Sequence, residues 1–77
     1  MNELLKRIAI NPEVMVGKPV IRGTRITVEL IMRELANGWT IADFLDAYPH
    51  LIEEDIRAAC AYAAASLADD KILIDAE

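Results

Sequence analysis

The order of apolar and polar residues predicts three helices between about residue 28 and residue 68. In the first, apolar side chains recur at i, i+3, i+4, i+7 and i+8, which is the spacing of one helix face. The residues at that spacing are Val28, Ile31, Met32, Leu35 and Ala36. Thr27 precedes this face and is suited to cap the helix through its hydroxyl. Gly38 ends the helix, because glycine accepts the left-handed conformation of a helix end.

The second helix is predicted to begin almost at once. Thr40 and Asp43 have the spacing of a capping box, in which each side chain accepts a backbone N–H of the other residue. Trp39 before the cap and Phe44 at the fourth helical position form the pair of a hydrophobic staple. Pro49 stops this helix. Its apolar face is formed by Ile41, Phe44, Leu45 and Tyr48.

The third helix is predicted from about Glu53 to about Ala68. One apolar stripe is formed by Ile56, Cys60, Ala63 and Leu67, so Cys60 is interpreted as a small buried hydrophobic residue. Many alanines smooth the rest of this helix, which raises its helicity and allows another helix to approach closely. The tail that follows contains Lys71–Ile74, an apolar run that favours a strand.

A small β unit is predicted before the helices. A short strand at Arg7–Ile10 is followed by an extended piece at Val14–Val16. Two further runs, Val20–Arg22 and Arg25–Thr27, are separated by two residues. The intervening Gly23–Thr24 predicts a type II′ hairpin turn, because glycine accepts the positive φ of its first central position.

These elements predict a mainly α protein with a single domain over residues 1–77. The β-hairpin unit occupies about 7–27, the three-helix core about 28–68 and the tail 69–77. Two short helices joined by a brief turn and followed by a longer helix form the outline of a helix-turn-helix core. That outline alone does not specify DNA binding, since many three-helix domains bind no nucleic acid.

Composition adds an expectation about partners. The chain of 77 residues is 55% hydrophobic, which is more than is usual for a soluble domain. A domain of this size buries only about 60% of its chain's surface on folding. Burial in a homodimer or against a partner protein is the simplest interpretation. The alternative is a helical monomer in which many small alanines count as hydrophobic.

Charge is distributed unevenly along the chain. Residues 1–33 hold six basic and three acidic residues, whereas residues 34–77 hold two basic and ten acidic residues, for a net charge of −5. This asymmetry predicts one cationic and one anionic face. Candidates to bind DNA or a carboxylate-rich partner are the basic residues around the hairpin, Lys6, Arg7, Lys18, Arg22 and Arg25. The alternative is a plain hairpin whose arginines are merely solvated.

Double-stranded DNA would have to be bound by this basic set. In a typical helix-turn-helix the N-terminal residues of the last helix enter the major groove. The third helix of this chain begins with Glu53, Glu54 and Asp55, whose carboxylates would repel phosphate. The hairpin and the N-terminal segment would therefore make most of any DNA contacts.

Catalysis is not indicated, and no catalytic residue, metal ligand or cofactor is predicted. His50 is the only histidine, so no pair of imidazoles is available for a metal; it follows Pro49 and is interpreted as a turn residue. The single Cys60 has no evident base and fits a reducing compartment. The N-terminus has no signal-peptide core, and no apolar run reaches the ~20 residues that span a bilayer. We expect a cytoplasmic protein without membrane contact.

The motif Gly17–Ile26, preceded by Asn11-Pro12, resembles the signature of the "domain of unknown function 433" family. The resemblance covers roughly residues 8–65, and its later matches are Leu35, Gly38, Thr40, Tyr48-Pro49, Leu51 and Asp55–Ala59. Two positions depart from the pattern. Val16 stands where many members have glycine, and Ile52 stands where many have a Thr or Ser cap, which is worth about 1 kcal/mol.

The resemblance implies a homeodomain-like helix-turn-helix core in a small bacterial or archaeal protein. Several members resemble antitoxins that are paired with nuclease-like toxins of the PIN type. It thus implies an antitoxin-like regulator that binds such a toxin and, by extension, its own promoter DNA. Two alternatives remain from the residues themselves: a free-standing dimeric helix-turn-helix regulator, and a non-enzymatic protein-interaction module.

Overall fold

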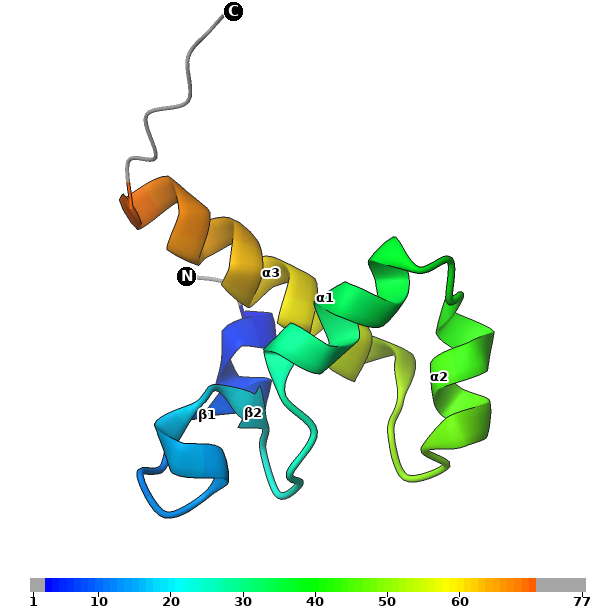
Figure 1. The fold of residues 1–77 in the computed structure, drawn as a ribbon, viewed down its shortest axis with the longest axis horizontal. Helices are drawn as coiled ribbons and strands as arrows, with labels where there is room; N and C mark the ends of the chain where they lie inside the picture. Colours follow the sequence, from blue (N-terminus) through cyan, green and yellow to red (C-terminus); the bar gives the residue numbers. More distant parts are fainter. Residues whose placement is uncertain (1–2, 71–77) are drawn as a thin grey trace, which may run out of the picture.

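The computed structural model describes residues 3–70, with side chains described for residues 3–68. Three α-helices follow a small antiparallel β unit (Figure 1), which confirms the predicted fold class. The elements in chain order are η1 (Glu3–Arg7), β1 (Ile8–Ala9), η2 (Met15–Gly17), β2 (Val20–Ile21), α1 (Val28–Ala36), α2 (Ile41–Ala47) and α3 (Glu53–Asp70). No helix within residues 3–70 is both long enough and apolar enough to cross a membrane. The strand predicted at Lys71–Ile74 lies outside the described residues.

Helix α1 forms as the sequence predicts. The Thr27 hydroxyl accepts a hydrogen bond from the Leu30 N–H at 3.0 Å, so it satisfies one of the free donors of the first turn. Gly38 ends the helix with φ +100°. Of the predicted apolar face, Val28 and Ile31 are buried. Met32 and Leu35 pack half-buried against the core, whereas Ala36 is exposed.

Helix α2 has the predicted capping box and staple. The Thr40 hydroxyl accepts the Asp43 N–H at 3.2 Å, and the Asp43 carboxylate accepts the Thr40 N–H at 2.8 Å. The ring of Trp39 packs edge-on against that of Phe44, with centroids 4.9 Å apart. Phe44 is completely buried, so the staple fixes the entry of α2 onto the core.

Helix α3 buries only part of the stripe predicted for it. Ile56, Ala58 and Ala59 are buried in the core, but Cys60 is exposed and Leu67 is 58% exposed. Contacts with η1, α1 and α2 select this face, because the two alanine methyls let those elements approach closely. The C-terminal half of α3 extends beyond them (Figure 1), which leaves Leu67 in solvent.

The β unit pairs its strands differently from the predicted hairpin. β1 and β2 run antiparallel, with Ile8 opposite Ile21 and Ala9 opposite Val20. The predicted partner run at 25–27 adds one bridge, between Val20 and Thr27, at the register expected from the sequence. The main two-stranded pairing is therefore made with the N-terminal segment.

The turn after β2 begins one residue earlier than predicted. The Thr24 N–H donates to the Ile21 carbonyl at 2.9 Å, and Gly23 has φ +82°. Positive φ at the third turn residue is typical of type II, not of the predicted type II′. The Thr24 hydroxyl explains the shift, since it donates to the Ile21 carbonyl and accepts the Ile26 N–H.

Of the extended piece predicted at Val14–Val16, only Val14 is extended; the prediction is wrong for Met15 and Val16. Met15, Val16 and Gly17 have φ values of +50°, +56° and +80°, so they form one left-handed turn. The Lys18 N–H closes it by donating to the Met15 carbonyl at 3.1 Å. A β-branched residue such as Val16 rarely adopts this conformation. The sequence therefore favoured a strand at this position.

Asp55 connects the N-terminal segment to α3. One carboxylate oxygen accepts the Ile52 N–H at 3.0 Å, and the other accepts Arg7 Nη1 at 3.3 Å. The Asp55 side chain is 9% exposed. It provides the half of a capping box that does not depend on the side chain at position 52, so the start of α3 is capped although Ile52 has no side-chain acceptor.

Asp55→Ala is expected to lower the free energy of unfolding by about 2 kcal/mol, because it removes a helix cap and leaves the Arg7 guanidinium without its partner. Urea denaturation followed by circular dichroism measures this loss. Glu54→Ala is the control, since Glu54 is exposed in the same helical turn, and it should change stability by less than about 0.5 kcal/mol. Equal losses in the two variants would contradict the capping role of Asp55.

Candidate functional site: an open groove beside Arg25

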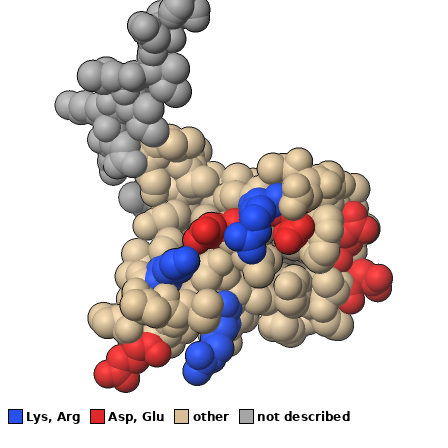
Figure 2. All heavy atoms as spheres, viewed as in Figure 1, with Lys and Arg blue, Asp and Glu red and all other residues tan. Residues whose placement is uncertain are grey.

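Three of the five basic residues predicted to bind a partner are paired with carboxylates. Lys6 pairs with Glu3 at 3.3 Å, Arg7 with Asp55, and Lys18 with Glu29 at 3.0 Å. On the face drawn in Figure 2, basic and acidic side chains lie interspersed over α1, and acidic side chains gather at the edge formed by α2. On this face (Figure 2), several basic side chains lie next to acidic ones.

The Arg22 side chain makes hydrogen bonds to backbone carbonyls within the fold. Its Nε donates to the Lys6 carbonyl at 2.9 Å, and its Nη2 donates to the Ile8 carbonyl at 3.0 Å. Its backbone N–H also donates to the Arg7 carbonyl at 2.7 Å. Arg22 therefore connects the end of β2 to η1 and β1. Its Nε and Nη2 groups are already used as donors in these hydrogen bonds.

Arg25 differs from every other Lys or Arg within residues 3–68. All the others make an ion pair or donate to a carbonyl, and Arg25 does neither. It is exposed and follows the turn at 21–24. A guanidinium with five unused donors is suited to a planar anion, which it binds through two parallel hydrogen bonds.

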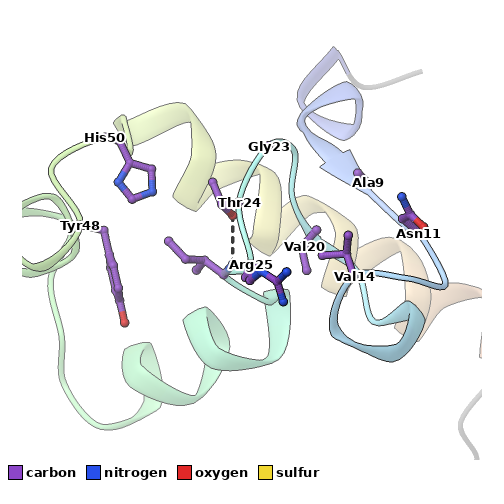
Figure 3. Close-up of a pocket in the computed structure, with 10 residues that line it drawn as sticks. Ala9, Asn11, Val14, Val20, Gly23, Thr24, Arg25, Tyr48 and His50 are labelled. Carbon is purple, nitrogen blue, oxygen red and sulfur yellow. Dashed lines mark hydrogen bonds between the residues drawn. The ribbon is translucent and has the colours of Figure 1, made fainter.

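An open groove of about 630 Å³ lies beside Arg25. It is formed by three segments: the loop between β1 and β2, the turn after β2, and the connection between α2 and α3. Its lining residues are Ala9, Asn11, Val14, Val20, Gly23, Thr24, Arg25, Ile26, Tyr48 and His50. In Figure 3, Arg25 lies between Val14 and Val20 on one side and Tyr48 and His50 on the other.

The groove combines one fixed positive charge with mostly apolar walls. None of its lining residues within the described part of the chain is acidic, so no carboxylate there competes for Arg25. Val14 and Tyr48 are half-buried, and Val20 and Ile26 are buried. An apolar wall next to a charge strengthens its attraction for an opposite charge that enters, because water is partly excluded.

His50 and Tyr48 were not predicted as site residues. Both lie in a turn closed by the Leu51 N–H, which donates to the Tyr48 carbonyl at 2.9 Å. His50 is exposed and makes no hydrogen bond or ion pair. Local sequence places it correctly in a turn, but only the packing of α2 and α3 brings this turn next to Arg25. Within residues 3–68, no cluster of three or more His, Cys, Asp or Glu side chains is arranged to hold a metal ion.

The chain is similar to known proteins over most of its length. The profile of the family described as "Protein of unknown function (DUF433)" matches residues 8–63. An uncharacterized protein of Sinorhizobium fredii, y4eO, is 37% identical over 59 residues, which is 77% of this chain and 27% of that protein. The crystal structure of a DUF433 member protein from Anabaena variabilis is 33% identical, with a TM-score of 0.76. The match covers 82% of this chain and 62% of that chain, so this chain spans less than two thirds of either relative.

The lowered pKa of Glu29 reports the ion pair between Glu29 and Lys18. A hydrogen bond from Lys18 and the charge of Lys18 hold this pKa below its usual value of 4.5, and Arg33 at 3.9 Å adds less. Because the folded pKa is lowered, the stabilisation is fully present above pH 4.5 and is lost as the pH falls through the folded pKa. Lys18→Met should raise the pKa of Glu29 more than Arg33→Met does, as followed by NMR titration of the Glu29 side-chain carboxyl carbon. A larger rise in Arg33→Met would contradict this assignment.

Proposed function

The chain belongs to the DUF433 family of proteins of unknown function, and we propose that it is an antitoxin-like binding protein. Its Arg25 groove receives a carboxylate of a protein partner. The observation that carries the proposal is the unpaired Arg25 guanidinium beside a groove that has no acidic lining residue. The other basic residues near the hairpin are already held by carboxylates or carbonyls.

A protein partner suits the groove better than a free small anion. The groove is open and its walls contain Val14, Val20 and Ile26, which favour apolar side chains next to the carboxylate. A partner segment that carries an acidic and an apolar side chain would satisfy both features. Affinity would come from burying the partner's apolar side chain against the half-buried Val14 and Tyr48, and orientation from the two-pronged contact with Arg25.

The family resemblance suggests a PIN-type nuclease as this partner. Acidic metal ligands line the active site of such a nuclease, and an inserted arginine would occupy them electrostatically. Arg25 is the residue that this chain offers for the purpose, because Arg22 is engaged with the Lys6 and Ile8 carbonyls. Inhibition would then need no catalytic group on this chain. His50 lines the groove without a carboxylate to orient it as a base.

Promoter binding has weaker support. The order α2, turn, α3 has the outline of a helix-turn-helix, with α3 in the position of the recognition helix. However, the first turn of α3 is acidic, and its single Arg57 pairs with Glu53 at 2.8 Å. A free-standing DNA-binding regulator is thus the alternative outcome of the experiment below.

Arg25→Gln is expected to weaken binding to a PIN-type nuclease encoded beside this chain by about tenfold or more, which is about 1.4 kcal/mol. Isothermal titration calorimetry measures the affinity, and cleavage of an RNA substrate measures inhibition. Arg33→Gln is the matched control, because Arg33 is similarly exposed but pairs with Glu29 on α1. It should leave the affinity unchanged within about twofold.

Two outcomes would contradict the proposal. Equal weakening by Arg25→Gln and Arg33→Gln would show that general charge, and not the groove, drives binding. Specific binding of the upstream duplex without a partner, with a salt dependence that Arg25→Gln reduces by about one counterion, would favour the DNA-binding regulator.

A further inference from the structure

The loop between β1 and β2 exposes an unusual amount of apolar surface. Among the described residues, five large hydrophobic side chains are exposed, and three of them lie in or beside this loop: Ile10, Met15 and Val16. Val16 is 91% exposed, the highest value of the five. The same loop supplies Asn11 and Val14 to the groove wall. The exposed apolar tip and the groove are therefore neighbours on one side of the molecule.

The tip is held in a strained conformation. Met15 and Val16 are the only residues other than glycine with positive φ within residues 3–70. For an L residue this region is unfavourable because Cβ approaches the following carbonyl, and a β-branched side chain adds to the crowding. Val16 makes almost no internal packing that would compensate, since it stands in solvent. Strain that presents an apolar side chain outward is typical of a binding element.

We propose that a second copy of this chain occupies the groove, with the Val16 tip of each copy seated in the groove of the other and Glu13 facing Arg25. This inference rests on the proposed role of the Arg25 groove as a carboxylate site. It adds regulation to that role, because a partner protein would have to displace the second copy before it could reach Arg25.

A reciprocal contact follows from the position of tip and groove on one surface. A two-fold dimer uses the same patch on both chains, so each tip can fill the facing groove at the same time. The apolar walls formed by Val14, Val20 and Ile26 suit the Val16 side chain. The contact would remove from water the exposed Val16 side chain and the accessible parts of Val14 and Tyr48, which are half-buried in a single chain.

Charge complementarity supports a second copy as the occupant. Glu13 lies three residues before Val16, and its carboxylate makes no hydrogen bond or ion pair; only its backbone N–H is used, by Asn11 Oδ1 at 2.9 Å. Arg25 is the unpaired cation of the groove. The tip thus carries an unpaired acid and the groove carries an unpaired base, which is the arrangement that a self-complementary interface needs.

Charge inversion tests this interface directly. Sedimentation equilibrium of the full chain is expected to show a dimer, and Glu13→Arg and Arg25→Glu should each weaken it by about tenfold or more, because each variant places two like charges together. An equimolar mixture of the two variants should restore the dimer, since both contacts of the mixed pair then join opposite charges. A mixture that stays as weak as either variant alone would overturn the proposed contact.

The tip is tested by a separate pair of variants. Val16→Gly removes the apolar side chain and relieves the strained backbone, so it should weaken association while raising the thermal midpoint of the monomer. Leu67→Ala, at the exposed end of α3, is the control and should leave association unchanged. A Val16→Gly variant that gains thermal stability but associates as tightly as the unaltered chain would overturn the role of the tip.

These results separate the inference from the proposed function. A chain that remains monomeric, yet loses its nuclease partner on Arg25→Gln, overturns only the second-copy contact. The converse result is that the mixed variants restore the dimer while Arg25→Gln leaves the affinity for the nuclease unchanged. That result supports the second-copy contact and overturns only the proposed function.

Discussion

The buried carboxylate of Asp55 is the interaction on which the arrangement of the molecule depends. It caps α3 through the Ile52 N–H and holds Arg7 from the N-terminal segment. The segment that leads into β1 is therefore fixed against the helix that closes the fold. Arg22 makes the second connection, by donating to the Lys6 and Ile8 carbonyls. With the N-terminal segment held by these two arginines, the turn after β2 presents Arg25 beside an open groove.

Local chemistry made much of the fold predictable. Thr27, Gly38 and the Thr40–Asp43 capping box were predicted correctly, because each acts through its own residue or through a hydrogen bond that spans only three residues. The Trp39–Phe44 staple is similarly local. The buried face of α3 was not predictable in this way: contacts with η1, α1 and α2 decide which side of an alanine-rich helix is covered, and those contacts turned Cys60 outward.

The candidate binding residues were harder to predict than the helices, because their pairing depends on the tertiary structure. Sequence pattern placed five cations around the hairpin. Lys6 pairs with Glu3 only three residues away, but other partners come from farther along the chain: Asp55 is 48 residues from Arg7, and Glu29 is 11 from Lys18. Arg25 can be identified as the unpaired basic residue of this set only once those pairs are known. The left-handed turn at Met15–Val16 was also not predicted, because Val16 favours extended structure and a positive φ is rare for residues other than glycine.

The outward position of Cys60 has a consequence for how two chains can be joined covalently. The sequence holds one cysteine, and its thiol side faces solvent on α3, an element that contributes no residue to the groove. Air oxidation cannot form a disulfide within residues 1–77; between two copies of this chain, a disulfide joins α3 of one molecule to α3 of the other. Such a crosslinked pair would be joined through α3, outside the residues that line the Arg25 groove.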